Sequence, residues 1–317
     1  MTEPLGEVFD LGYQHYQGPR EGRRRARMAL WVNGMRTALG VGRGSRAKIL
    51  PVLLFVSAMA PAVIFTLIAS RLGPSVNVPG HSGYYETVSI VLLLFSAIIA
   101  PELLCPDRRE GVIHLYFVRP LTATDYVAGR WLAFFSITLA LAYSGQIVLL
   151  VGFTLAAGEP LDYLRANWLD IPRFLAAGIV LAAFTTTLPM AMSAFTTRRA
   201  YAAALVIGLY FVSASVAGAL TAVERSNTET LPPAQGVPGQ SQPVADNKAS
   251  WLSLLDIGQA PNRVNRLIFV EKADASAGSQ TAEPAAELPA IVTIGSYLLL
   301  TAGPGFALWR RYQRIGS

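Results

Sequence analysis

A short stretch rich in ionisable residues, Pro106–Trp131 (PDRREGVIHLYFVRPLTATDYVAGRW), lies between two strongly apolar segments. Four arginines and three carboxylates lie there, punctuated by Gly111 and Pro120. Such groups hold a partner through ion pairs and hydrogen bonds, while Leu115 and Phe117 offer apolar contact area. We interpret this stretch, the cassette, as a docking element.

The motifs of catalysis are missing from the sequence. A P-loop needs a lysine after a glycine-rich turn, and none of the three lysines follows a glycine. The three histidines lie in separate segments without metal-ligand spacing, and Cys105 is the only cysteine. We therefore expect no catalytic, cofactor-binding or metal-binding residue in this chain.

Composition places the chain in a membrane. Of its 317 residues 52% are hydrophobic and only 15% are charged, and the mean hydropathy is +0.41. Soluble domains carry about 25% charged residues, so this chain has too little charge to cover a water-exposed surface. The net charge of +6 therefore concerns membrane orientation, and we expect no nucleic-acid partner.

Apolar runs of about 20 residues can cross the hydrocarbon core as helices. The sequence predicts an all-α integral membrane protein, because its apolar runs lack the alternation of barrel strands. Six transmembrane helices are expected, at Ile49–Ser70, Tyr84–Cys105, Trp131–Ala157, Ile171–Phe195, Ala200–Ala222 and Pro289–Trp309. The first run is too long for a cleavable signal and is expected to be retained.

The basic residues predict the orientation of these spans. Most of the 26 Lys and Arg residues fall before the first span, in the cassette, between the fourth and fifth spans, and in the C-terminal tail. Basic residues in short connections stay on the cytoplasmic side. Both termini and the cassette are therefore expected in the cytoplasm.

Four regions follow from this layout. A cytoplasmic N-terminal segment (1–48) precedes five spans (49–222), which include the cassette loop (106–130). An extracytoplasmic loop (223–288) leads to the last span and a cytoplasmic tail (289–317). Within the first region, Arg23–Gly40 predicts an amphipathic interfacial helix in the headgroup plane, with Met28, Trp31 and Met35 on its apolar face.

The extracytoplasmic loop has three parts. Ser226–Ser250 is rich in Pro, Gln, Ser and Gly and is expected to be largely disordered, as is Glu271–Leu288, which has few bulky apolar residues. Trp251–Val270 regains apolar residues and predicts short helices broken near Pro261. This island either packs as a lid on the outer mouth of the bundle or simply rests at the interface.

Local rules also predict the shape of the cassette. Pro106 is expected to end the second span, Asp107 or its neighbours to cap a short helix, and Pro120 to end that helix. Leu115, Phe117 and Val118 would form an apolar knob on it. Arg108 and Arg119 are expected to be exposed at its rim, so that alanine there has little effect.

The cassette resembles the conserved cytoplasmic loop of ABC-2 type permeases, the transmembrane subunits of one branch of ATP-binding-cassette transporters. The matching features are Asp107-Arg108, Gly111 before the short helix Val112–Val118, Arg119-Pro120 and Gly129-Arg130-Trp131. Val112 replaces the family's usual Thr, and Arg130 replaces its usual Lys. The six-span layout, the amphipathic N-terminal helix and the external segment before the last span also resemble the family.

The resemblance implies a permease subunit that exports a hydrophobic or amphiphilic substrate and binds no cofactor itself. ATP and Mg would be bound by two copies of a cytosolic ABC ATPase, and a second permease copy or paralogue would complete the pore. The resemblance also implies that the short helix is a coupling helix that contacts the ATPase. The ATPase-coupling residues would be Asp107, Arg108, Glu110, Gly111, Leu115, Phe117, Arg119 and Pro120.

Two other classes of function remain open from the sequence. A membrane scaffold or assembly factor without cargo could use the same cassette to dock a cytosolic partner. An intramembrane enzyme is disfavoured, because its catalytic constellation is missing. The excess of Arg over Lys in an Ala-rich chain favours a GC-rich bacterium, and therefore a bacterial inner membrane.

Overall fold

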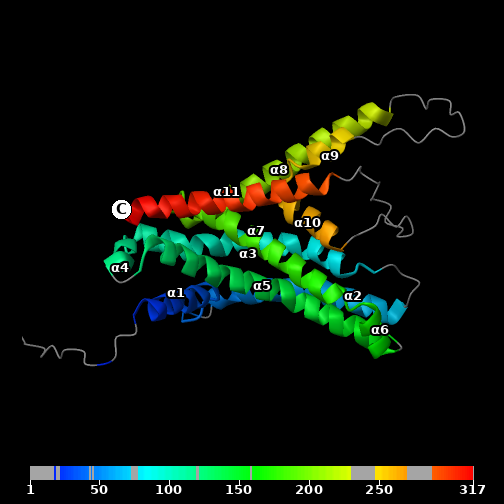
Figure 1. Cartoon of the computed structure of the whole chain (residues 1–317), viewed down its shortest axis with the longest axis horizontal. Helices are drawn as coiled ribbons and strands as arrows, with labels where there is room; N and C mark the ends of the chain where they lie inside the picture. The colour runs from blue at the N-terminus through cyan, green and yellow to red at the C-terminus, as the bar shows by residue number, and fades with distance from the viewer. Residues whose placement is uncertain are drawn as a thin grey trace, which may run out of the picture.

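The computed structural model (Figure 1) describes residues 18, 22–42, 44, 46–72, 78–118, 121–157, 159–229, 247–269 and 288–316, and the regular structure within these ranges is helical. Six of these helices are long and apolar enough to cross a membrane, which confirms the all-α membrane fold. They are α2 (Arg46–Leu72), α3 (His81–Arg109), α5 (Ala123–Ala156), α7 (Asp170–Ser193), α8 (Arg199–Glu229) and α11 (Ala290–Gly316).

Shorter helices occupy the connections within the described ranges. They are α1 (Gly22–Ala38), α4 (Ile113–Val118), α6 (Pro160–Ala166), α9 (Asn247–Ser253) and α10 (Ala260–Phe269), with a 3-10 turn at Ile257–Gln259. Figure 1 places α1, α4 and the C-terminal end of α11 at one end of the bundle, the α4 end. It places α6 at the opposite end, the α6 end.

Both spans beside the cassette are longer than the sequence indicated. α3 does not end at Pro106 but continues to Arg109, because packing of neighbouring helices compensates for the backbone hydrogen bond that a proline removes. α5 begins at Ala123, well before Trp131. Its start is fixed by a capping box, in which the side chains of Thr122 and Asp125 each accept the other's backbone N–H.

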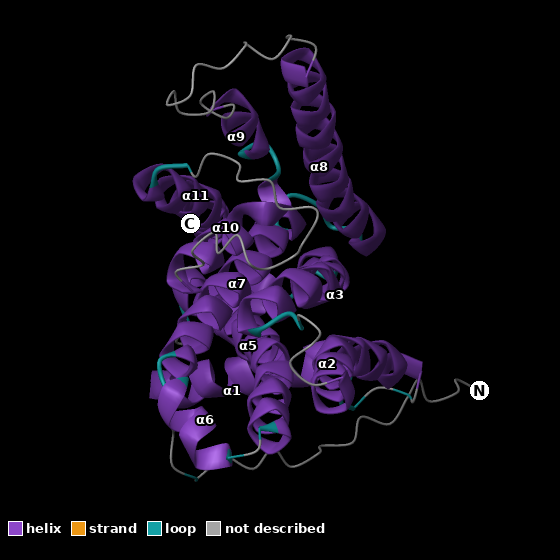
Figure 2. Ribbon diagram, turned by 90° about the vertical axis from the view of Figure 1, so that its right-hand side faces the viewer, coloured by secondary structure: helices purple, strands orange, loops and turns teal. Residues whose placement is uncertain are grey.

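The centre of the bundle consists of α3 and α7, with α5 packed along both. Their buried side chains include Phe95, Leu103, Phe134 and Leu181. In contrast, α2, α8 and α11 keep most of their apolar surface exposed, and such surface faces lipid or another protein in a membrane. Figure 2 shows α8, with α9 beside it, standing apart from the central helices.

Glycine and tyrosine allow the spans to approach closely. Gly145 of α5 has no room for a methyl group, because the ring of Tyr84 from α3 fills that space. The Tyr84 hydroxyl donates a hydrogen bond to the carbonyl of Ala58 on α2 at 3.1 Å. Gly178 of α7 meets Tyr85 in the same way. Small residues at such contacts are typical of helices packed in membranes.

The expected N-terminal helix is present as α1, but its buried face differs from the expected apolar stripe. Leu30, Gly34 and Ala38 are its buried residues and pack on α5, whereas Met28 is 53% exposed. Trp31 is half-buried, and its indole N–H donates to Ser136 of α5 at 3.3 Å. Met35 is half-buried against the core. The position of α1 in the headgroup plane stays a prediction.

Both ends of the segment 226–250 are helical where their composition predicted disorder. α8 continues to Glu229 and α9 begins at Asn247, so disorder was the wrong expectation at both ends of 226–250. Residues 230–246 and 270–287 lie outside the described residues. Pro261 does not break a helix but sits in the first turn of α10, where its missing N–H costs nothing. α10 packs on α3, α7 and α11.

Candidate functional site

The short helix of the cassette forms at the α4 end. The backbone N–H of Glu110 donates to the carbonyl of Pro106 at 2.9 Å and closes α3. Gly111 then turns the chain with a φ of +68°, a value that favours glycine, and leads into α4. Ile113 anchors α4 in the core, while Leu115 is 65% exposed. α4 therefore presents an apolar side chain outward from a fixed base.

A buried ion pair joins α3 to α5 behind α4. Oδ2 of Asp107 accepts from Nη2 of Arg130 at 2.6 Å and from the hydroxyl of Tyr126 at 2.7 Å. The Arg130 side chain is only 3% exposed, and its Nε and Nη1 have no partner in the described structure. Removing Asp107 would leave a buried, unpaired charge, so this pair holds the two helices firmly in register.

Aromatic rings extend this contact to α4 and α11. The ring of Tyr126 lies 5.3 Å from that of Tyr116 on α4 and 5.4 Å from that of Tyr312 on α11. Arg130 also lies over the Tyr126 ring, with its guanidinium carbon 5.7 Å from the ring centroid. Tyr126 therefore connects α4, α5 and α11 at one point.

Two arginines secure the end of α7 at the same level. Arg108 of α3 donates to the carbonyl of Ala194, which caps α7, and to that of Thr196 at 3.2 Å. Nε of Arg311 on α11 donates to the same Ala194 carbonyl at 2.7 Å. Cations are favourable at the negative end of a helix dipole. The expectation that Arg108 is an exposed rim residue is wrong, because it bridges two spans.

The start of α5 is fastened to α1 by a further charge cluster. Asp125 is 7% exposed and lies 2.7 Å from Nη2 of Arg23 and 2.7 Å from Nε of Arg27. One turn further along, Gly129 of α5 packs on Leu30 of α1. Residues later in α1 contact residues later in α5, so α1 lies alongside the first turns of α5.

The structure gathers most of the expected coupling residues around α4. Asp107, Arg108, Glu110, Gly111 and Leu115 lie in or beside its connection to α3. Arg119 and Pro120 lie outside the described residues, and so does the side chain of Phe117. Sequence reasoning missed Tyr126, Arg311 and Tyr312 as members of this site. These three residues carried no local signal in the sequence. Asp125 did carry one, because it is the N3 residue of the capping box Thr122–Asp125.

The polar side chains around α4 make their contacts from one helix to another. In the part of the chain that the structure describes, no three His, Cys, Asp or Glu side chains come together as a metal site. The polar contacts instead tie α3, α5, α7 and α11 into one base beneath α4. Fold and site together define a helical membrane protein with a short, partly exposed helix at one end.

Comparison with known proteins gives the family. The model of the family described as ABC-2 family transporter protein matches residues 11–310, nearly the whole chain. The chain therefore belongs to the ABC-2 transporter family, which confirms the resemblance in the cassette. It is a multi-pass transmembrane subunit of an ABC transporter, a class of subunit that is not catalytic. A comparison with curated proteins finds no match.

Proposed function

We propose that this chain is the permease subunit of an ATP-driven exporter of a hydrophobic or amphiphilic substrate, and that α4 docks a separate cytosolic ABC ATPase. The exposed Leu115 on a helix anchored by Ile113 carries this proposal. An apolar side chain held outward on a rigid support loses little conformational entropy when it enters a groove on a partner. Family membership implies an ABC ATPase partner.

The proposed orientation puts the α4 end in the cytoplasm. Arg23, Arg108, Arg199 and Arg311 all lie at this end. Arginine near the end of a span favours the cytoplasmic side. In this orientation both termini are cytoplasmic, α6 and α10 face outward, and the host membrane is a bacterial inner membrane.

The mechanism that we propose is rigid-body coupling. ATP, bound with Mg at two ATPase copies, supplies the energy. Closure of the ATPases then moves α4 in each permease. Because Asp107 and Arg108 tie the end of α3 to α5 and α7, movement of α4 carries those spans with it. A cavity between two permease copies then changes shape. Packed helices move as units because their interfaces do not deform continuously.

Leu115→Asp tests the docking role. A carboxylate buried without a partner costs on the order of several kcal/mol, so the partner ABC ATPase should no longer co-purify. Leu161→Asp is the matched control, because Leu161 is 70% exposed on α6 at the opposite end. If Leu115→Asp keeps the ATPase at wild-type yield, α4 is not the docking helix.

Two further measurements separate the proposal from its rivals. In a chain without Cys105, an impermeant maleimide applied to sealed cells should label Leu161→Cys and spare Leu115→Cys; the reverse pattern overturns the orientation. Vesicles that hold both subunits should accumulate an amphiphilic dye with ATP. ATPase binding without transport of any tested amphiphile would favour a scaffold without cargo.

A further inference from the structure

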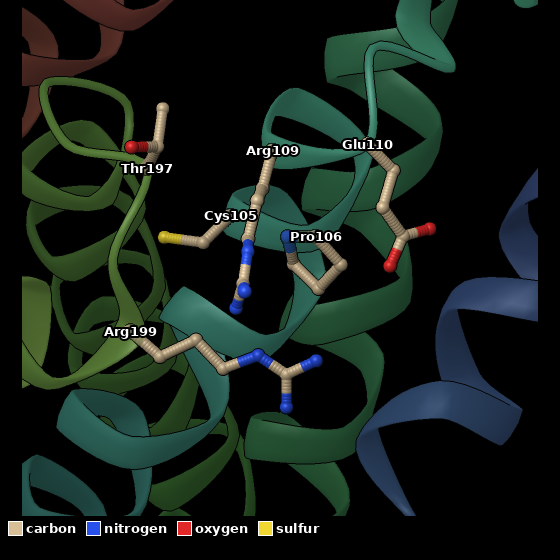
Figure 3. Close-up of a pocket in the computed structure, with 6 residues that line it drawn as sticks. All are labelled: Cys105, Pro106, Arg109, Glu110, Thr197 and Arg199. Carbon is tan, nitrogen blue, oxygen red and sulfur yellow. The ribbon is translucent and has the colours of Figure 1, made fainter.

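A cavity of about 270 Å³ opens at the α4 end between the last turns of α3 and the start of α8 (Figure 3). Its lining residues come from these two regions, which are distant in sequence. They are Cys105, Pro106, Arg109, Glu110, Thr197 and Arg199. Of the expected coupling residues only Glu110 lines the cavity; Asp107, Arg108 and Leu115 do not.

Two arginines and one carboxylate, that of Glu110, line this cavity. Figure 3 shows the guanidinium of Arg109 reaching down toward Arg199, while the carboxylate of Glu110 points away from both. The Arg109 side chain is exposed and makes no hydrogen bond or ion pair with the described residues. Arg199 shares the carboxylate of Glu102 at 3.1 Å and remains half-exposed. Two guanidinium groups on one cavity repel each other unless an anion lies between them.

The surroundings indicate which anion fits. α8 begins at the cavity with Arg199, and the exposed side of α8, turned away from Arg199, carries Tyr201 (61% exposed) and Leu205 (44% exposed) in its first two turns. A ligand here would have a negative headgroup in the cavity and an apolar body along α8. Phosphate matches guanidinium groups through paired hydrogen bonds, and basic pockets between spans on the cytoplasmic side suit anionic lipid headgroups.

We propose that this cavity binds the phosphate of an anionic phospholipid in the cytoplasmic leaflet. Arg109 and Arg199 hold the phosphate, and the acyl chains lie against the exposed face of α8. The lipid thereby bridges the end of α3 and the start of α8. The choice of leaflet rests on the proposed orientation. The residues that hold the lipid make no contact with the ATPase in the proposed function, so failure of this proposal leaves the docking role of α4 untouched.

The test is titration of the purified full-length chain with dioleoylphosphatidylglycerol, followed by native mass spectrometry. Each arginine near an anionic lipid contributes about 1 kcal/mol, so Arg109→Gln should weaken the tightest site about fivefold and Arg109→Gln with Arg199→Gln about 30-fold. Dioleoylphosphatidylcholine should bind weakly to all variants. Arg24→Gln with Arg36→Gln removes the same charge from exposed positions on α1 and should keep wild-type affinity.

Three results would overturn the proposal. Unchanged phosphatidylglycerol binding in Arg109→Gln would show that Arg109 does not hold the lipid. Inorganic phosphate that displaces the lipid at equal concentration would place a soluble phosphate in the cavity. If the double variant Arg109→Gln with Arg199→Gln binds the lipid like wild type but no longer co-purifies with the ATPase, the cavity binds an acidic side chain of the ATPase. Arg109→Lys keeps the charge and should stay within about twofold of wild type.

Discussion

At the scale of single residues, the buried pair Asp107–Arg130 determines how α3 and α5 meet. Asp107→Leu leaves the charge of Arg130 without a partner, and Arg130→Met leaves that of Asp107. Each change should destabilise the chain by about 3–5 kcal/mol, whereas the double variant should lose less than either single variant. Thermal unfolding of the four purified proteins measures this cycle; additive losses would mean that the pair is not coupled.

Arg108 differs from its neighbour Arg109 in what its side chain contacts. Arg108 donates to two carbonyls at the end of α7, whereas Arg109 is exposed and makes no hydrogen bond or ion pair with the described residues. Hydrogen bonds that involve a charged group contribute about 1.5–3 kcal/mol each. Arg108→Ala should therefore lower the melting temperature in detergent clearly, and Arg109→Ala should leave it unchanged. Equal effects would refute the bridge to α7.

Two asparagines of α10 should respond in opposite directions. Asn262 and Asn265 are both nearly fully buried. The Asn262 amide donates to Ser89 and Gln259, whereas neither amide atom of Asn265 has a partner in the described structure. A buried polar group without a hydrogen bond costs about 1–3 kcal/mol. Asn265→Leu should raise thermal stability and Asn262→Leu should lower it; a loss with Asn265→Leu would reveal an unseen partner.

The sequence identified the right residues here but few of their partners. Asp107 and Arg108 stood out because charges between apolar runs are rare and local. Their partners Arg130 and Ala194 belong to α5 and to the end of α7, and their proximity follows from helix crossing, which no local spacing encodes. Arg108 was misjudged for that reason: its exposure depends on where α7 ends.

At the scale of elements, the contact between α1 and α5 depends on two glycines. A Cβ at Gly129 would lie 2.8 Å from Leu30, and one at Gly34 would lie 2.6 Å from Ala133. Gly129→Leu should therefore displace α1 and expose its arginines to trypsin, which then cleaves in 23–27 faster than in wild type. Gly303→Leu is the control, because nothing lies within 4 Å of that position on α11. Equal cleavage in both variants would contradict the docked position of α1.

Helix boundaries show which local signals can be read in advance. α4 was predicted to within one residue, because Gly111 marks its start and its apolar run is short. The early start of α5 was also readable, since Thr122 and Asp125 form a capping box. The prediction placed the start at Trp131 because the apolar run begins there. The continuation of α3 past Pro106 was not readable, because it depends on helices that pack around the proline.

At the scale of the whole molecule, α8 is one of three spans, with α2 and α11, that stay mostly exposed. It is apolar over most of its length but packs mainly on α3 and α9, and Figure 1 shows it diverging from the bundle. The sequence predicted this span correctly and could not predict its divergence, because an apolar run looks the same whether it faces lipid or protein. Helix packing, and not hydrophobicity alone, holds helices together in lipid.

A second copy of this chain is the partner that we expect along α8. In a two-fold dimer, a residue near the axis meets its own counterpart, so a single cysteine can cross-link two copies. With Cys105 replaced by Ala, Phe211→Cys (72% exposed before substitution) should form a disulfide-linked dimer in native membranes after mild oxidation. Leu299→Cys on α11 is the control, because Leu299 is 74% exposed on another lipid-facing span. Cross-linking at Leu299 alone would move the interface to α11. A monomer in both variants, in membranes where the ATPase still co-purifies, would assign the second half of the pore to a different permease.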